Sequence, residues 1–194
     1  MNRTFLTGIA AVIAASAMVA CAHPAAQAPA ITTTAATATS HEHDFEWLVG
    51  HWSVRHHRLK ERLTGCAAWE DFAGTSTEWL TMGGLGTVDD NVIELPSGMY
   101  RAMGVRAFDP KTEEWLIWWH DERTPTALDP PVRGGFKDGV GTFIADDTLR
   151  GKPIKVRFRW SKITATSAHW EQAFSPDGGA TWEVNWEMDF TRVQ

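Results

Sequence analysis

Residues 175–193 read SPDGGATWEVNWEMDFTRV, and their second half alternates between polar and apolar side chains at every step. Successive side chains of a β-strand point to opposite faces, so this period of two predicts a half-buried strand. The apolar residues expected on the buried face are Trp182, Val184, Trp186, Met188 and Phe190. The polar residues expected on the opposite face are Thr181, Glu183, Asn185, Glu187 and Asp189.

The beginning of the same stretch matches the Asp-box pattern S-x-D-x-G-x-T-W, which is best known from sialidases and other β-propellers. The matching residues are Ser175, Asp177, Gly179, Thr181 and Trp182. A chain of 194 residues is too short for a propeller of several four-stranded blades. An aspartate can accept backbone N–H bonds in a tight turn, and glycine supplies positive φ there. We therefore interpret the box as the turn of a hairpin and not as part of a glycosidase.

Strands with the same period follow one another through the upstream sequence, separated by turn signals. The expected strands are residues 52–63, 67–80, 87–95, 99–108, 113–122, 135–138, 140–149, 152–160, 167–175 and 181–193. A short helical turn precedes them, with Asp44 as its N-cap and Gly50 at its end. A sheet of about ten antiparallel strands must curl, and closure removes its exposed edges. We predict an all-β fold: one closed antiparallel barrel, wide enough to hold one small ligand.

The composition narrows the classes of function. A net charge of −6 and the lack of a Lys/Arg-rich run argue against a nucleic-acid-binding protein. The chain contains eleven tryptophans but only one tyrosine. Aromatic side chains dominate the energetics of protein cores, so most of these tryptophans are expected to fill the core. Some of them are alternatively expected to line a ligand cavity.

Gly50 and Trp52 form a G-x-W motif at the start of the first expected strand, and Arg192 lies almost at the end of the last one. This pairing resembles the calycins, which include lipocalins, fatty-acid-binding proteins and nitrobindin-like barrels. The resemblance implies that Trp52 closes one end of the barrel and that Arg192 stacks on it as a cation on an aromatic ring.

Three segments, FEWLVGHWSV (45–54), FDPKTEEWLIWW (108–119) and residues 175–193, also resemble a family of bacterial exported barrels, domain of unknown function family 1579. The resemblance covers roughly residues 44–194. It implies a calycin-like barrel but no particular activity, because a fold does not imply a function.

The N-terminal sequence predicts export. Residues 1–22 have the charged start, the apolar run and the small residues of a signal peptide, and the apolar run is too short to span a membrane. Cys21 is either the lipidated first residue of a lipoprotein or is removed with the signal. Residues 23–43 are rich in Ala, Thr and Pro and are predicted to be a disordered tether. We expect a periplasmic protein or an outer-membrane-anchored lipoprotein, which touches a membrane only through lipid on Cys21.

Strand parity suggests which residues face the barrel interior. His56 and Arg58 share the face of Trp52, while Arg106 lies beside small residues that leave room for a cavity. Arg106 is expected to be the main anchor for an anionic or carbonyl-bearing ligand, with His56 and Arg58 as secondary anchors. Alternatively, these residues pair with structural acids such as Glu70 or Glu78. The full expected ligand site is His56, Arg58, Arg106, Trp119, His120, Trp170 and Trp186. His120 begins the proline-containing segment 120–131, which could be a flap over the barrel mouth.

Several functions remain open on this basis. The preferred prediction is non-catalytic binding of a small apolar or amphipathic molecule. An alternative is an isomerase or lyase that uses His56 or His120 as general base and Arg106 as stabiliser. A third possibility is a structural envelope protein whose barrel is filled by its own tryptophans. The resemblance to nitrobindin-like barrels implies a fourth, a barrel that binds haem through one histidine. For haem the candidate ligands are His56, His120 and His169, although His169 lies on the face opposite Trp170. No other cofactor and no metal site is expected.

Overall fold

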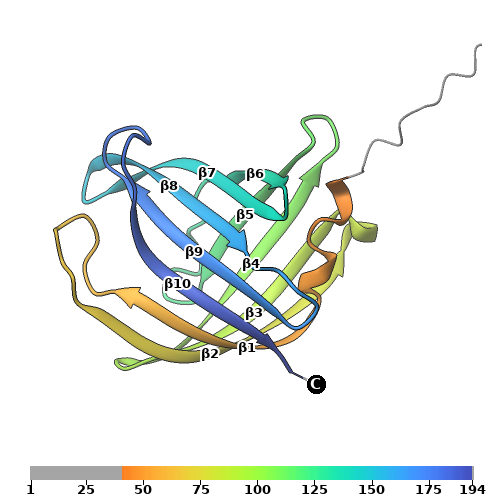
Figure 1. The fold of residues 1–194 in the computed structure, drawn as a ribbon, viewed down its shortest axis with the longest axis horizontal. Coiled ribbons are helices and arrows are strands. Elements are labelled where there is room, and N and C mark those ends of the chain that lie inside the picture. The colour runs from red at the N-terminus through yellow and green to blue at the C-terminus, as the bar shows by residue number, and fades with distance from the viewer. Residues whose placement is uncertain (1–40, 194) are drawn as a thin grey trace, which may run out of the picture. The chain divides into compact units, whose positions relative to one another are not determined.

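The computed structural model describes residues 41–193, which form one closed antiparallel β-barrel (Figure 1). Each strand pairs with its predecessor in the chain, and the tenth strand closes on the first. Connections therefore alternate between the two ends of the barrel. The predicted fold class is confirmed. The predicted signal peptide, the lipidation site at Cys21 and most of the predicted tether lie outside the described residues.

The strands are β1 (Gly50–Leu59), β2 (Trp69–Thr81), β3 (Gly86–Leu95), β4 (Gly98–Asp109), β5 (Glu114–Asp121), β6 (Val132–Lys137), β7 (Val140–Leu149), β8 (Lys152–Ser161), β9 (Ser167–Ser175) and β10 (Glu183–Arg192). Three short 3-10 helices accompany them, η1 (His41–His43), η2 (Glu46–Leu48) and η3 (Met82–Gly84). No helix within residues 41–193 is long and apolar enough to cross a membrane. Strand β1 ends four residues before the predicted bound, because Leu63 and Gly65 beyond it adopt positive φ.

The segment before β1 closes one end of the barrel. The side chains of Phe45 and Leu48 are almost completely buried in the core. Asp44 is not the helix cap that the sequence predicted: Phe45 holds the N-cap position of η2, and Asp44 contacts the ring of His41 instead. Residues 41–43, predicted as the end of the tether, form η1, and the backbone oxygen of His41 accepts a hydrogen bond from Trp115 Nε1 at 2.8 Å.

Trp52 and Arg192 meet at this closed end, as the calycin resemblance implied. They are paired residues of β1 and β10, and the Arg192 guanidinium carbon lies 4.2 Å from the centroid of the Trp52 ring. Arg192 also donates to the backbone oxygen of Val49 at 2.6 Å. Gly50 has a φ of 122°, and a Cβ atom there would lie 2.6 Å from Arg192 Nη1. Both the backbone conformation and this close approach therefore require glycine.

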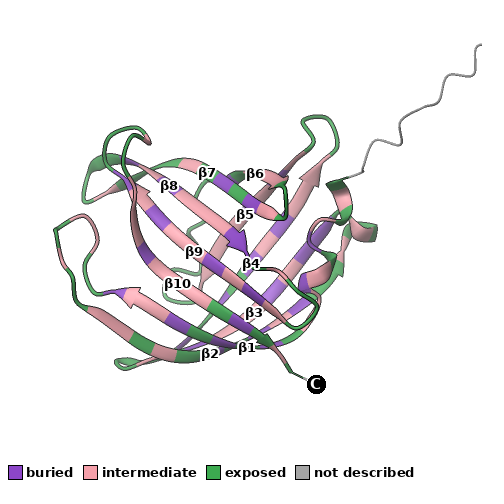
Figure 2. Cartoon of the chain, in the orientation of Figure 1, coloured by how far each residue is buried: buried purple, intermediate pink, exposed green. Residues whose placement is uncertain are grey.

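The core fills the barrel interior, and buried and exposed residues alternate along most strands (Figure 2). In β8, Val156 and Trp160 are buried on the face that the sequence predicted. Strand β10 departs from the predicted alternation, because its pairing with β9 shifts register between Val184 and Trp186. A β-bulge inverts the facing of residues on one side of it. Trp182 consequently lies under the Arg157 guanidinium on the outer face, whereas Trp186 points inward.

The seam between β5 and β6 is short. Three residues of β5, Trp115, Leu116 and Ile117, pair with β6, and the strand beyond Ile117 pairs with β4 alone. Residues 122–131 then connect the two strands without regular structure, and β6 begins at Val132, directly after the last proline. The barrel wall is therefore open between the end of β5 and the loop 122–131.

Candidate functional site: an aromatic cavity at the β5–β6 opening

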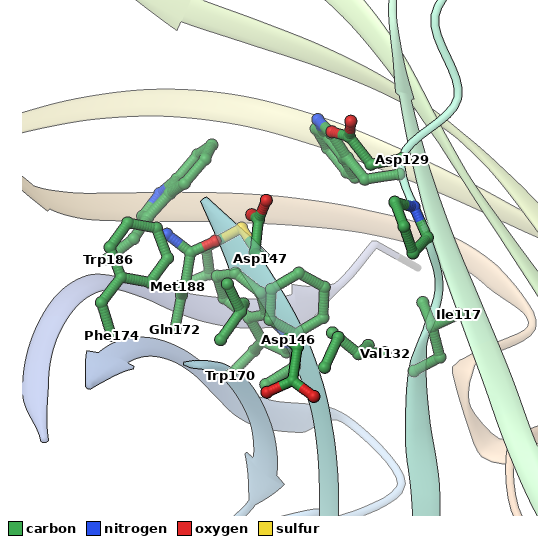
Figure 3. Close-up of a pocket in the computed structure, with 15 residues that line it drawn as sticks. Ile117, Asp129, Val132, Asp146, Asp147, Trp170, Gln172, Phe174, Trp186 and Met188 are labelled. Atoms are coloured by element: carbon green, nitrogen blue, oxygen red, sulfur yellow. The ribbon is translucent and has the colours of Figure 1, made fainter. Parts of the chain in front are cut away.

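A cavity of about 140 Å³ lies inside the barrel where β5 and β6 separate. Loop 122–131 contributes Asp129 and Pro130 to its wall, and Trp119 extends into it from the part of β5 that has no β6 partner. Figure 3 shows Trp186, Phe174 and Gln172 on one side, with Ile117 and Asp129 opposite. The remaining apolar lining is Val132, Ala145, Val156, Phe158, Trp170 and Met188.

Three tryptophans from three strands form much of this wall. The Trp186 ring is 6.4 Å from that of Trp119 and 6.0 Å from that of Trp170, at interplanar angles of 77° and 85°. Edge-to-face contacts of this kind are the favoured arrangement of aromatic pairs. Trp170 also packs edge-on against Phe158, with ring centroids 5.0 Å apart. The mutual contacts hold the three rings in a fixed orientation around the cavity.

A second, smaller void of about 40 Å³ adjoins the cavity towards the closed end of the barrel. The two voids share lining residues, among them Trp119, Trp170 and Met188. Arg106 and Asp89 line the smaller void but not the cavity.

Arg106 is neutralised within the protein and is not available as the ligand anchor that the sequence suggested. Its Nη1 lies 2.8 Å from Glu78 Oε1 and 2.7 Å from Asp89 Oδ2, and all three side chains are buried. The alternative prediction, pairing with a structural acid such as Glu78, is the arrangement found. Gly104 does not widen the cavity either, since a Cβ atom there would lie 2.7 Å from the Asp89 carboxylate.

The cluster of Glu78, Asp89 and Arg106 contains two carboxyl groups for one guanidinium. Burial, together with the nearby Asp89 carboxylate, raises the pKa of Glu78 well above its ordinary value, although Arg106 opposes the shift. A proton on Glu78 makes the cluster neutral overall. This charge state fits an interior position, because an uncompensated buried charge is strongly destabilising.

His56 is buried on the inner face of β1, in contact with Trp186, and does not line the cavity. Its ring stacks on Phe72 at a centroid distance of 4.7 Å, and its Nδ1 accepts a hydrogen bond from Trp186 Nε1 at 3.2 Å. Burial, and secondarily the charge of Arg58, lowers the pKa of His56 to about 4. His56 is therefore neutral at pH 7, and it positions the Trp186 ring.

Arg58 is also separated from the cavity. It pairs with Glu70 across β1 and β2, its guanidinium carbon lies 5.5 Å from the centroid of Trp186, and it is not among the residues that line the cavity. The pairing with Glu70 is again the structural alternative that the sequence left open.

His120 and His169 lie on the outer surface. His120 Nε2 contacts the backbone oxygen of Pro125 at 2.8 Å, in a groove that also contains Met103. His169 Nδ1 is 2.8 Å from the carboxylate of Asp189. Neither histidine lines the cavity, and neither does His56. The donor set that a haem group would require is therefore not found in this cavity. Within residues 41–193 no group of His, Cys, Asp and Glu is arranged to hold a metal ion.

The residues of the alternative catalytic prediction do not converge. His56 lies behind Trp186, His120 lies on the outer surface, and Arg106 is enclosed between two carboxyl groups. A general base and an electrophilic stabiliser must both reach the reacting atoms. No observation in the described structure favours the enzyme alternative over binding.

Sequence reasoning missed the acidic residues at the opening of the cavity. Asp146 and Asp147 lie in β7, within the strand predicted for residues 140–149, but neither was among the candidate site residues. Asp147 is on the same face as Phe143 and Ala145, which point inward, while Asp146 forms an outward ion pair with Lys155 at 2.6 Å. Counting alternate residues from Phe143 would have identified Asp147. Asp129 gave no such signal, because it lies in a loop.

The Asp-box forms the β9–β10 turn on the outside of the barrel. Asp177 accepts hydrogen bonds from the Thr181 hydroxyl at 2.6 Å and from the Thr181 amide at 2.8 Å. These bonds, with a further one from Ser175, lower the pKa of Asp177 to about 2. Gly179 has a φ of 103°, and its backbone oxygen accepts a bond from Trp182 Nε1. The box is a structural turn.

No family model and no curated protein matches this chain. Among solved structures, an S-type phycobiliprotein lyase from Guillardia theta is similar with a TM-score of 0.53 and 11% identity, over 80% of this chain and 93% of that chain. The protein EF1p2_mFAP2b, solved bound to DFHBI, matches with a TM-score of 0.43 and 10% identity, over 79% of this chain and 100% of that chain. The likeness to the lyase shows the fold alone: the protein is a calycin-like β-barrel. Membership of domain of unknown function family 1579 stays a prediction.

Proposed function

We propose that this protein binds a small apolar or amphipathic molecule in the aromatic cavity without catalysing a reaction. The observation that carries the proposal is the cavity itself, with its eleven apolar or aromatic side chains next to an opening in the barrel wall. Binding sites for small molecules are typically concave and mostly apolar, with a few placed polar groups. The volume of about 140 Å³ is close to the roughly 150 Å³ of a cavity that accommodates benzene. The buried part of the ligand is therefore about as large as one ring.

Native mass spectrometry of the purified protein, with an absorption spectrum of the same sample, tests this proposal. We expect a co-purifying mass that disappears in Trp119→Ala, which removes part of the wall, and in Ala145→Phe, which fills the cavity. Trp79→Ala is the matched control, because Trp79 is half exposed and does not line the cavity. An apo mass, together with unchanged tryptophan fluorescence on titration with small aromatic compounds, would contradict the proposal. That result would favour a structural barrel filled by its own side chains.

The proposal includes export, with the barrel in the periplasm or anchored to the outer membrane through lipid on Cys21. Its support is the signal-like sequence of residues 1–22 and the Ala/Thr/Pro-rich segment that follows. The intact mass of the protein from its native cell envelope tests this part. A chain that begins at Cys21 with added acyl chains, lost in Cys21→Ser, is the expected result. A chain that retains Met1 and stays in the cytosol would contradict export.

A further inference from the structure

The ionisable groups that line the aromatic cavity are all carboxylates. They are Asp129 from loop 122–131 and Asp146 and Asp147 from β7, and the lining contains no Lys, Arg or His. Two cations lie close to the cavity without lining it, and both are paired within the protein. Arg106 lines the smaller void and is compensated by Glu78 and Asp89. Arg58, whose guanidinium carbon lies 5.5 Å from the centroid of the Trp186 ring, pairs with Glu70. The neutral polar side chain in the lining, Gln172, donates its amide to Asn185 at 2.8 Å, which leaves its carbonyl oxygen as an acceptor.

Asp146 has an ion-pair partner among the described residues, whereas Asp129 and Asp147 have none. Asp146 is paired with Lys155 on the outer face of the barrel. Neither Asp129 nor Asp147 forms an ion pair with another described residue, and the bond that Asp147 accepts comes from the neighbouring backbone amide of Thr148. Figure 3 shows Asp147 directed towards the side chains of the cavity and Asp146 directed away from them. Two uncompensated negative charges therefore flank the opening.

The aromatic wall supplies a second attraction for positive charge. The face of an indole ring carries negative potential, and tryptophan is the best aromatic partner for an organic cation. Trp119, Trp170 and Trp186 surround the cavity from three strands, and the contacts among them fix their orientation. Such rings attract a cationic group more strongly where it is removed from water.

We propose that the ligand of this cavity is an organic cation, an amine or quaternary ammonium compound, whose charged group lies among Trp119, Trp170 and Trp186 and near Asp129 and Asp147. The inference rests on the proposed binding function and assigns its ligand class. It reverses the expectation from the sequence, in which Arg106 was to anchor an anionic or carbonyl-bearing group. A cavity of about 140 Å³ has room for one trimethylammonium group with a short polar tail.

Isothermal titration calorimetry with three probes of matched shape tests the inference: choline, its uncharged analogue 3,3-dimethylbutan-1-ol, and the anion 3,3-dimethylbutanoate. We expect choline to bind about fivefold or more tightly than the alcohol, and the anion to bind most weakly. The preference should fall when Asp129 and Asp147 are both changed to Asn, and it should weaken at high salt, because exposed charges are screened. Asp138→Asn is the matched control and should keep the preference, because Asp138 is an exposed aspartate that does not line the cavity.

Binding of the alcohol or the anion as tightly as choline would overturn the cation inference while leaving the binding function intact. Failure of all three probes at millimolar concentration would also overturn it, and the binding function would then depend on the co-purifying mass and its response to Trp119→Ala. A neutral or anionic co-purifying molecule overturns the inference as well. A preference for choline that survives in the double Asn variant, but is lost in Trp186→Phe, would assign the selectivity to the rings alone and overturn the role of the carboxylates.

Discussion

At the scale of the single residue, the surroundings of His56 determine its protonation state and therefore its role. A histidine on an inward face of a barrel is a natural candidate for a general base, because its ordinary pKa lies near neutrality. In this protein the ring is stacked on Phe72 and bonded to Trp186, and burial lowers its pKa to about 4. Its role is to position a tryptophan of the cavity wall.

The lowered pKa of His56 makes stability depend on pH. In the unfolded chain the ring takes up a proton near pH 6.5, whereas in the folded chain it does so near pH 4. The stabilisation is therefore fully present above pH 6.5 and is lost as the pH falls from 6.5 towards 4. Between pH 7 and pH 5 we expect this residue to remove about 2 kcal/mol from the free energy of unfolding.

Urea denaturation of the wild type and His56→Asn at both pH values measures this effect. The variant should lose most of the difference between pH 7 and pH 5, even if it is less stable throughout. His57→Asn is the control, because His57 lies on the outer face and contacts Asp71. Equal pH dependence in the wild type and His56→Asn would contradict a neutral buried ring.

At the scale of the strands, the cluster of Glu78, Asp89 and Arg106 joins β2, β3 and β4 on the inner face. Breaking a buried ion pair by removing one partner leaves uncompensated charge in the interior. We expect Arg106→Met to lower the free energy of unfolding by about 3–5 kcal/mol. Glu78→Gln should cost much less at pH 7, because the raised pKa of Glu78 already favours its protonated form.

Arg101→Met provides the comparison in this experiment. Arg101 lies on the same strand as Arg106 but pairs with Asp90 on the exposed outer face. Exposed ion pairs contribute about 0–1 kcal/mol, so this variant should be close to the wild type in a urea titration. Similar losses in Arg101→Met and Arg106→Met would mean that the inner cluster does not hold the three strands together.

Turns and bulges also decide which side chains of a strand face the barrel interior and which face the outside. The Asp-box turn ends in a bulge at Asn185, so that Trp182 and Trp186 lie on opposite sides of the barrel wall although they are four positions apart, an even spacing. An uninterrupted strand would have placed both indoles on one face. The bulge therefore supplies one tryptophan to the cavity and one to the outer surface.

At the scale of the whole molecule, the least extensive strand pairing in the barrel is between β5 and β6, and not between the first and last strands, β1 and β10. Strands β1 and β10 pair continuously from Trp52 to Arg58, whereas β5 and β6 pair through three residues of each strand. Local opening requires little free energy where few backbone hydrogen bonds must break. We expect the β5–β6 seam beside the cavity to be the region through which a ligand enters.

Amide hydrogen exchange measures this difference directly. Beyond Ile117 the amides of Trp119 and Asp121 face the side on which β6 is missing, so we expect them and the amides of loop 122–131 to exchange fast. Amides of β1 and β10 should be as protected as those of β8. Saturation with a bound ligand should slow exchange at the β5–β6 seam in particular. Faster exchange along β1 and β10 than at β5–β6 would contradict this assignment of the opening.

The sequence by itself determined the all-β class, the ten strands and the closing of the barrel. These follow from the period of two, from turn residues and from the need to pair strand edges. The contact of Trp52 with Arg192 was implied by the resemblance to calycins and not by the periodicity. The sequence also identified Trp119, Trp170 and Trp186, which line the cavity. The tertiary structure alone decided which charged side chains are paired. The charge of Arg106 is compensated by Glu78 and Asp89 from two other strands, and Asp129 reaches the cavity from a loop. Such pairing depends on distances between strands far apart in sequence, which periodicity does not encode.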